Sequence, residues 1–505
     1  MLSHPGPANP NVHIGQSSPL TVSVALGRKT MTTSGMFTFS VAASAPMVVL
    51  LGAIPASYAA TSVVGVPLCF LLVGAVVALL SVGYTTLSRH IPHPAVYYAV
   101  LARGLGRPSG VAGGMVALLA YNVIQTSLYG LLGATLNDLF GLPWWLWALL
   151  AVALVGVVGV RSVALSTRLL ATVLVLSFVA LLMFGAAAVS HPADGNLSAD
   201  GFKFAELAKS GIGGAAAYCL AALMGFEAAA SFSEETRARA APARAVFLAL
   251  GVLVVAYAVS AWAMGVAVGP QQVATVAADP AGGLPFNVFA EGYGSLMPPL
   301  VRAMLVAAII TSLLALHSIA ARYGFAMARE GVLPKAIAST GSGRLTGSPF
   351  GGSLLQSGIA LLVVLSFAMA GADPMTTLFA WFSTLGALAL LALLVVTSLA
   401  AMAYLPGRGV DNENLWRRRI APALGVLTGA VVLGTMVVNV DSMLGAGPDS
   451  RLPYVIPAVV VAAAIGGVLL AIYLRVAKPD VYFKIGRGQP RRHAVVDVQL
   501  ADIEL

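Results

Sequence analysis

Residues 211–236 read GIGGAAAYCLAALMGFEAAASFSEET, and this stretch decides how the rest of the chain is interpreted. It is apolar enough to cross a membrane, but Met224-Gly225-Phe226 interrupts its helical pattern and Glu227 follows at once. A carboxylate near the bilayer centre costs at least about 2.5–3.5 kcal/mol, so such residues usually face the bundle interior and serve a function. The alternative is a structural acid that stays protonated and bonds to neighbouring backbone. The stretch predicts a broken membrane helix with a buried acid.

The composition of the whole chain excludes most soluble classes of protein. Of 505 residues, 59% are hydrophobic and 9% are charged, and the mean hydropathy is +0.90. A typical soluble domain carries about 25% charged residues, which it needs to cover its surface. A soluble enzyme and a nucleic-acid-binding domain are therefore excluded, although the net charge is +9. The solvent of this protein is largely lipid, and we expect the bilayer rather than nucleic acid as its partner.

Twelve apolar runs are long enough to be membrane helices, because about 20 residues are needed to cross roughly 30 Å of hydrocarbon. They predict an all-α integral membrane protein with 12 transmembrane helices. The runs lie near residues 38–60, 64–88, 110–133, 143–160, 167–188, 211–233, 246–268, 298–320, 353–371, 375–404, 420–440 and 453–475.

The distribution of basic residues predicts the orientation of these spans. If the N-terminus is cytoplasmic, nearly all of the 28 Lys and Arg residues fall on the cytoplasmic side. The exceptions are Lys203, Lys209, Arg302 and Arg451. Because basic loops remain in the cytoplasm, we expect a plasma-membrane protein with both tails, 1–36 and 476–505, in the cytoplasm.

A second interruption lies in the first span, where the chain reads GAIP from Gly52 to Pro55. Pro55 lacks an amide hydrogen, and Gly52 lowers helix propensity by about 1 kcal/mol relative to alanine. An ordinary proline kink would also explain this pattern. The two breaks are five spans apart, as expected for two inverted five-helix repeats at 37–190 and 191–404, followed by two helices at 405–475. Facing breaks offer amides to an anion and carbonyl oxygens to a cation, which suits a zwitterion.

Four segments carry a resemblance to a known family. Span eight leads into ARYGFAMAREGVLP at 321–334, and GFE in span six is followed by SEETR at 233–237. GAIP in the first span and PAVYY at 94–98 complete the set. Together they resemble the amino acid–polyamine–organocation permeases over roughly residues 38–480, with span eight as the most specific piece.

The resemblance implies two inverted five-helix repeats plus two C-terminal helices, with broken helices 1 and 6. It also implies an amino acid or related amine bound between these helices, and no cofactor, metal or catalytic residue. The amides that it assigns to the substrate carboxylate belong to Gly52, Ala53 and Ile54. The carbonyls that it assigns to the ammonium belong to Ala221, Ala222 and Met224, beside Phe226 and beside Gly225, which leaves room for the substrate. The candidates for the pocket wall are Tyr121, Asn122, Gln125, Trp381 and Ser383, for which helix packing is an equally good explanation.

Three departures from the family pattern bear on gating and coupling. Ala53 and Pro55 replace a glycine and a phenylalanine of the first-helix motif. Ala221 stands where an aromatic gate is often found, and residues 167–188 contain no lysine that could face the acid of span six. Without a cationic partner, burial favours the neutral form of Glu227. We therefore expect Glu227 to exchange a proton during transport, in proton symport or in a proton-sensitive exchange mode.

Sodium coupling is the alternative to proton coupling. Thr311 and Ser312 on span eight could face backbone carbonyls of span one and supply hard oxygen ligands. Hydroxyl pairs in membrane helices serve mainly in helix–helix hydrogen bonds.

Charged residues at the end of span six predict a cytoplasmic gate. Glu234 and Glu235 precede Arg237 and Arg239, and a latch between these acids and bases could break as the gate opens. An ordinary solvated charge cluster is the alternative. His93 lies in a basic loop between spans two and three, which we expect to be solvated, and no metal role is expected for it.

The best interpretation of the sequence is a secondary active transporter that moves amino acids or related amines by alternating access. A sodium-coupled or exchange-mode transporter of a polyamine or other amine is the runner-up. A channel is less well supported because no filter loop is evident. A membrane-embedded enzyme would need paired acids or a nucleophile with a base inside the spans, and Glu227 stands there alone.

Overall fold

The computed structural model describes residues 31–160, 163–236, 238–279, 283–341, 348–406, 413–445, 447 and 449–488. The secondary structure of these residues is helical, which confirms the predicted all-α class. Of the two predicted tails, residues 1–30 and 489–505 lie outside the described residues.

Apart from α5, the helices of the first half of the chain overlap the predicted runs. They are α1 (Thr33–Ala43), α2 (Pro46–Val48), the π-helical turn η2 (Val49–Ala53), α3 (Ile54–Thr61), α4 (Val66–His90), α5 (Val96–Gly104), α6 (Arg107–Phe140), α7 (Trp144–Gly159) and α8 (Val163–Ser190).

The second half of the chain contains more short elements. They are η3 (Asp200–Phe202), η4 (Phe204–Ala208), α9 (Ile212–Leu223), the 3-10 helix η5 (Phe226–Glu235), α10 (Ala241–Val268), α11 (Val273–Ala278), α12 (Leu284–Tyr293), α13 (Met297–Arg329), η6 (Lys335–Ala338), α14 (Phe350–Met369), η8 (Pro374–Phe379), α15 (Ala380–Tyr404), η9 (Trp416–Ile420), α16 (Ala421–Val438), α17 (Val440–Leu444), α18 (Leu452–Ala477) and α19 (Pro479–Lys484).

Eleven helical segments of the described residues are long and apolar enough to cross a membrane, and they match eleven of the twelve predicted runs. The exception is α7, which has 16 residues. At 1.5 Å per residue it extends only about 24 Å, less than the roughly 30 Å of a hydrocarbon core. The chain is therefore a multi-pass membrane protein, and the twelfth span remains a prediction.

The spans that contain the two predicted interruptions lie at the centre of the bundle. The most apolar stretch of Thr33–Thr61 is 78% buried inside the protein, and that of Ile212–Glu235 is 83% buried. The corresponding fractions are 28% in Phe350–Met369 and 22% in Leu452–Ala477. α14 and α18 therefore lie at the periphery of the bundle, and the first and sixth spans lie inside it.

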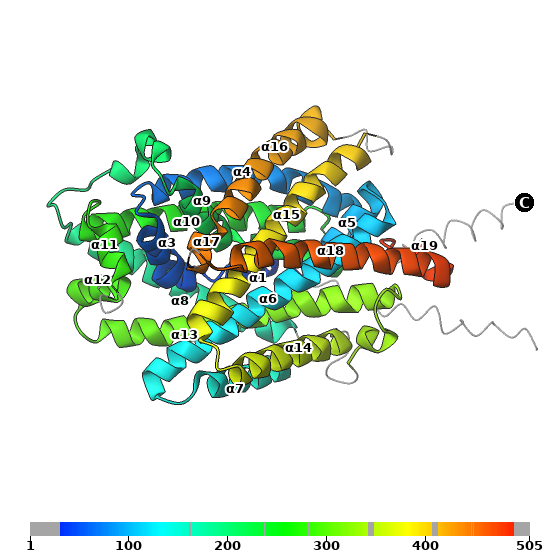
Figure 1. Ribbon diagram of the computed structural model, residues 1–505, viewed down its shortest axis with the longest axis horizontal. Coiled ribbons are helices and arrows are strands. Elements are labelled where there is room, and N and C mark those ends of the chain that lie inside the picture. The colour runs from blue at the N-terminus through cyan, green and yellow to red at the C-terminus, as the bar shows by residue number, and fades with distance from the viewer. Residues whose placement is uncertain are drawn as a thin grey trace, which may run out of the picture.

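The helices run between two opposite ends of the bundle (Figure 1). α3, α11 and α12 lie at one end, which we call the distal face. α5 and α19 lie at the other end, which we call the terminal face because the described chain ends there. The short helices α11 and α12 were not predicted from the sequence; α11 packs against α3, and α12 packs against α8.

The long helix α6 connects several parts of the bundle, because it contacts α5, α13, α15 and α18. Its contact with α18 is a close approach of the two backbones. A Cβ atom on Gly467 would lie 2.5 Å from the Cα atom of Ala112, whereas a Cβ atom on the adjacent Gly466 would meet nothing within 4 Å. The absence of a side chain at Gly467 therefore permits this packing.

The substitution Gly467→Ala should lower the melting temperature of the protein, because overpacking a tight contact costs about 1–3 kcal/mol. Gly466→Ala is the matched control, and it should leave the melting temperature unchanged or slightly higher because alanine favours the helix. Thermal unfolding of the detergent-purified variants measures both effects. Equal melting temperatures for the two variants would contradict the close packing of α18 on α6.

Candidate functional site

The first span is interrupted at Ser44 and Ala45. α1 ends at Ala43, Ala45 adopts the left-handed conformation with φ 49° and ψ 63°, and Pro46 begins the next helix. The cause is local, because a residue before proline is disfavoured in the helical region and Pro46 has no amide hydrogen to continue α1. Such a conformation costs a non-glycine residue about 1–3 kcal/mol and persists where the surrounding structure enforces it.

The predicted position of this break, at residues 52–55, is wrong. Val49–Ala53 forms the wide turn η2, and the chain continues into α3 with the N–H of Ile54 donating to the carbonyl of Val49. A π-type turn inside a helix accommodates a residue that cannot make the regular hydrogen bond. Pro55 therefore widens the helix without ending it.

The sixth span breaks where the sequence predicts. Met224 is extended with ψ 146°, Gly225 has φ 104°, and η5 follows. A Cβ atom on Gly225 would lie 2.8 Å from the carbonyl carbon of Ala43 and from the backbone nitrogen of Ser44. Glycine is required here both by its positive φ and by this close approach. The two interruptions are in direct contact inside the bundle.

Glu227 is fully buried beside this contact. Its carboxylate accepts hydrogen bonds from the N–H of Gly225 at 2.9 Å and from the hydroxyl of Tyr121 at 3.2 Å. The hydroxyl of Tyr84 donates to the backbone carbonyl of Glu227 at 3.2 Å. The bond to Gly225 is a contact with neighbouring backbone, as the structural alternative predicts. Because this bond spans the break, the side chain of Glu227 stabilises the turn.

A cavity of about 320 Å³ lies beside the two breaks. Several residues that the sequence analysis assigned to the site line it, namely Gly52, Ala53, Ala221, Ala222 and Met224. The break residues Ala43, Ser44 and Ala45 also line the cavity, although the sequence analysis did not assign them. Other parts of the wall come from Ile124 and Leu128 of α6, Phe379 of η8, Ser383 of α15 and Met443 of α17.

The remaining predicted site residues lie outside this lining. Ile54 and Phe226 are fully buried in the core. Gln125 accepts a hydrogen bond from the amide of Gln356 and donates to the hydroxyl of Tyr129 at 3.2 Å, while Tyr121 bonds to Glu227. Of the pocket-wall candidates, Ser383 is the one that the structure places in the cavity.

The hydroxyl groups of the predicted sodium alternative lie on α13, close to span one. Ser312 donates to the carbonyl of Ala42 at 2.6 Å and to the carbonyl of Ala308 at 2.9 Å. Thr311 donates to the carbonyl of Ala308 at 2.9 Å. Ser312 therefore faces a carbonyl of span one, as expected, whereas the bond of Thr311 stays within its own helix.

Two ion pairs join η5 to α13 on the side of the terminal face. The guanidinium of Arg329 donates to both carboxylate oxygens of Glu234, at 3.0 and 2.9 Å. Arg322 donates to Glu235 at 2.6 and 3.3 Å. The guanidinium of Arg322 also lies 4.4 Å from the ring centre of Phe232. Bidentate arginine–carboxylate pairs are strong and directional, so they fix the end of η5 against α13.

Glu234 and Glu235 pair with arginines that are far away in the sequence, which the sequence analysis did not predict. Arg237 lies outside the described residues, so its part in the gate stays a prediction. The reason is tertiary, because η5 packs against α13. A sequence signal was available, since Arg322 follows a long apolar run and a cation there requires a carboxylate partner.

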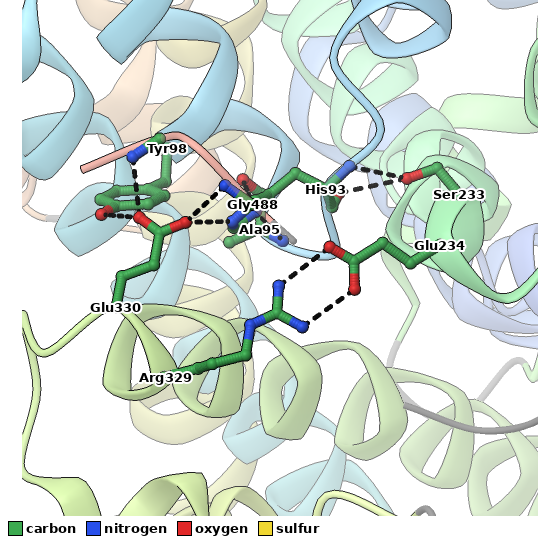
Figure 2. A network of polar contacts seen from close by, with 9 residues as sticks. His93, Ala95, Tyr98, Ser233, Glu234, Arg329, Glu330 and Gly488 are labelled. Atoms are coloured by element: carbon green, nitrogen blue, oxygen red, sulfur yellow. Dashed lines mark hydrogen bonds and ion pairs between the residues drawn. The ribbon is translucent and has the colours of Figure 1, made fainter. Parts of the chain in front are cut away.

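A second polar cluster on the terminal face surrounds Glu330 (Figure 2). Its carboxylate accepts hydrogen bonds from the imidazole of His93 at 3.0 Å and from the hydroxyl of Tyr98 at 2.6 Å. It also accepts backbone N–H bonds from Gly486 at 2.7 Å and Gly488 at 2.9 Å. The cluster thereby joins the end of α13, the loop before α5 and the chain after α19.

His93 occupies the centre of this part of the structure. Its side chain is 1% exposed, so the expectation of a solvated loop is wrong. The backbone N–H of His93 donates to the hydroxyl of Ser233 at 3.0 Å, which connects the loop to η5 beside the Glu234–Arg329 pair (Figure 2). The loop is buried because α13, η5 and the residues after α19 converge on it.

The chain belongs to the amino acid permease family, because the model of this family matches residues 31–461. This places it in the amino acid–polyamine–organocation superfamily, as the sequence motifs predict. No curated protein is detectably similar in sequence.

Solved structures show the same fold at low sequence identity. A manganese transporter of Eremococcus coleocola, in complex with an aromatic bis-isothiourea substituted compound, is 13% identical. Its TM-score is 0.57, and the match covers 92% of this chain and 99% of that chain. A mutant of the same transporter is 15% identical, with a TM-score of 0.54 and coverage of 89% and 95%. The family and these neighbours identify a membrane transporter.

The contact between the two breaks predicts that Gly225→Ala destabilises the protein. The new side chain would be strained by the positive φ, at about 1–3 kcal/mol, and would also collide with the backbone of the first span. Gly52→Ala is the control, because a Cβ atom there meets nothing within 4 Å. We expect Gly225→Ala to lower the melting temperature relative to the unmodified protein, and Gly52→Ala to leave it unchanged. A melting temperature equal to that of the unmodified protein would contradict the break-to-break contact.

The Glu330 cluster predicts a pH-dependent part of the stability. Burial by itself raises the pKa of Glu330, but hydrogen bonds from His93, Tyr98 and Gly488 hold this pKa below its usual value. A lowered folded-state pKa means that the carboxylate stabilises the fold above the unfolded glutamate pKa of about 4.3. This stabilisation is lost as the pH falls through the folded-state pKa.

Glu330→Gln should therefore lower the melting temperature at pH 7, because breaking a buried charged cluster costs about 3–5 kcal/mol. The difference from the unmodified protein should narrow as the pH falls below about 4.3. Glu291→Gln, at an exposed acid of α12, is the control. If the difference in melting temperature between Glu330→Gln and the unmodified protein stays constant from pH 7 to pH 3.5, the Glu330 carboxylate is not the source of the pH-dependent stability.

Proposed function

We propose that the protein is a secondary active transporter of an amino acid or a related amine, working by alternating access in the plasma membrane. The observation that carries the proposal is the cavity of about 320 Å³ beside two broken helices that touch each other. Broken helices that meet inside a membrane bundle are the usual position of substrate sites in transporters. The family match supports a small-molecule substrate.

The dipoles of the broken helices suit the charged head of an amino acid. The second half of span one begins at Pro46, so the positive end of its dipole is at the break. α9 ends at Leu223, so the negative end of its dipole and its last carbonyls are at the same place. A carboxylate is favoured at the first end and an ammonium at the second. In this proposal the carboxylate lies near the positive helix end that begins at Pro46 and is held by the helix dipole. The amides of Ser44, Ala45 and Ile54 do not hold it, because each of them donates to a carbonyl of its own span.

The packing around the breaks differs between the distal and the terminal side, and this difference supports alternating access. The cavity is lined on the distal side by residues of α3, η8 and α17, such as Ala56, Met375 and Met443. On the terminal side, the Glu234–Arg329 and Glu235–Arg322 pairs hold η5 against α13. In our proposal the terminal face is cytoplasmic, the described state is closed there, and these pairs separate when the inner side opens.

Proton coupling through Glu227 is part of the proposal. Its carboxylate is buried within two residues of the break and bonds to Gly225, so its protonation alters the hydrogen bond that stabilises the turn in the sixth span. Protonation removes one acceptor position and adds a donor. A change of charge at this point therefore acts directly on the geometry of the sixth span.

Glu227→Gln should abolish the pH dependence of substrate uptake between pH 5 and pH 8, because glutamine resembles the protonated acid and does not titrate. Tyr121→Phe, which removes one hydrogen bond to the carboxylate, should keep the pH dependence and change only its midpoint. Uptake into liposomes that contain the purified variants is the measurement. Unchanged uptake with an unchanged pH profile in Glu227→Gln would overturn proton coupling through this residue.

Sodium coupling is the second candidate, because the hydroxyl of Ser312 contacts the carbonyl of Ala42 in span one. Oxygen ligands of this kind suit a hard cation. Replacement of external sodium by choline separates the two mechanisms. Loss of uptake in choline would favour sodium, and retained uptake would favour the proton.

A further inference from the structure

Most of the side chains that line the cavity are apolar, and its polar side chains are uncharged hydroxyl groups. Among the described residues of the lining there is no acidic or basic side chain. The bulkier apolar contributions come from Val48, Ile124, Leu128, Met224, Met375 and Phe379. A ligand that fills this space meets methyl, thioether and aromatic groups.

Three hydroxyl groups of the cavity wall already donate to the protein. Ser127 donates to the carbonyl of Ile124 at 2.8 Å, and Ser383 donates to the carbonyl of Ala380 at 3.2 Å. The hydroxyl of Tyr218 donates to the carbonyl of Ser442 at 3.3 Å. These three hydroxyl groups therefore have no hydrogen left to donate to a ligand, and the helix ends at the breaks remain as the source of charge complementarity.

The size of the cavity restricts the ligand further. A volume of about 320 Å³ lies at the low end of the range for small-molecule sites, which is about 300–1,000 Å³. This volume suits a single small solute better than a long, flexible polyamine.

A ligand with more than one carboxylate and one ammonium would leave a charge without a partner. Four helix ends meet at the breaks. The end of α1 is bonded by Ser312 and Tyr257, and the start of η5 by the carboxylate of Glu227. The positive end at Pro46 and the negative end of α9 are left for a ligand. A further charge would lie among apolar side chains, where an unpaired ion is strongly disfavoured. An apolar side chain on the substrate would instead gain by leaving water.

We propose that this cavity is the side-chain pocket of the transporter and that it selects amino acids with uncharged, apolar side chains. The proposal rests on the proposed function, because the amino acid head must be held at the breaks. It excludes cationic and acidic amino acids, diamines and divalent metal ions as preferred substrates. The manganese transported by the structural neighbours is therefore not expected to be the substrate here.

Counterflow in liposomes tests this specificity. Purified protein is reconstituted in liposomes that contain unlabelled leucine, and the entry of labelled leucine is measured. External methionine, phenylalanine, lysine, glutamate, putrescine or Mn²⁺ is added as the competitor. We expect half-inhibitory concentrations at least tenfold lower for methionine and phenylalanine than for the charged compounds. Equal or stronger inhibition by lysine, glutamate, putrescine or Mn²⁺ would overturn the apolar pocket.

A separate outcome identifies failure of the proposed function itself. Labelled alanine, leucine, lysine and glutamate are each tested for exchange against the same internal compound. If none of them exchanges, the protein is not an amino acid transporter and the proposed function fails. If lysine or glutamate exchanges better than leucine, the function stands and the apolar pocket fails.

A substitution at Gly52 tests whether this cavity holds the substrate side chain. Gly52 lines the cavity, and a Cβ atom there meets nothing within 4 Å, so a larger side chain enters open space. Gly52→Leu should raise the half-inhibitory concentrations of leucine and phenylalanine at least tenfold. It should raise the half-inhibitory concentration of alanine less than twofold. Gly52→Ala should shift the same preference in the same direction by a smaller factor.

Gly434→Leu is the matched control for this experiment. Gly434 is an exposed glycine of α16 that also has nothing within 4 Å of an added Cβ atom, but it is outside the cavity lining. We expect its inhibition profile to be unchanged. Exchange of labelled alanine shows that each variant is folded. If the two Gly52 variants retain the unmodified preference for leucine over alanine, the assignment of the cavity is wrong.

Discussion

The structure depends on one constraint, which is that peptide groups freed by a helix break must find partners inside the membrane. Both central spans break at the same place, and the fold satisfies many of the exposed groups there. The carboxylate of Glu227 accepts the N–H of Gly225, and Ser312 donates to the carbonyl of Ala42. Tyr257 donates to the carbonyl of Ser44 at 3.1 Å, and the hydroxyl of Ser40 accepts the N–H of Ala229 at 2.9 Å. The other helices are arranged around this set of bonds.

The same constraint explains the asymmetry of the molecule. On the distal side of the breaks the helices separate enough to leave a cavity, and on the terminal side they are joined by charged pairs. The Glu235–Arg322 pair is buried and the Glu234–Arg329 pair is largely buried. Separating such pairs is costly unless water or other polar groups replace the lost contacts. The Glu330 cluster extends this closure to the loop before α5 and to the chain after α19.

Several features could be predicted from local sequence because their causes are local. A run of apolar residues specifies a membrane helix by length, and eleven predicted runs are confirmed. The break at Gly225 could be predicted because glycine followed by a buried acid is rare in a membrane helix. The predicted position of the break in the first span was wrong because this span contains two prolines, and the effect of each depends on the surrounding structure. Pro46 ends a helix next to Ala45, whereas Pro55 is absorbed by the wide turn η2.

The amino-acid sequence by itself determined the all-helical class, the number of strongly apolar spans to within one, the family and the buried acid of span six. These follow from hydrophobicity and backbone chemistry, which act over a few turns of helix. Tertiary structure alone decided which residues of α6, η8 and α17 complete the wall of the cavity and which arginines pair with Glu234 and Glu235. It also decided that His93 is buried against Glu330. Such contacts join residues more than 80 positions apart, and no local pattern specifies which helices come together at that distance.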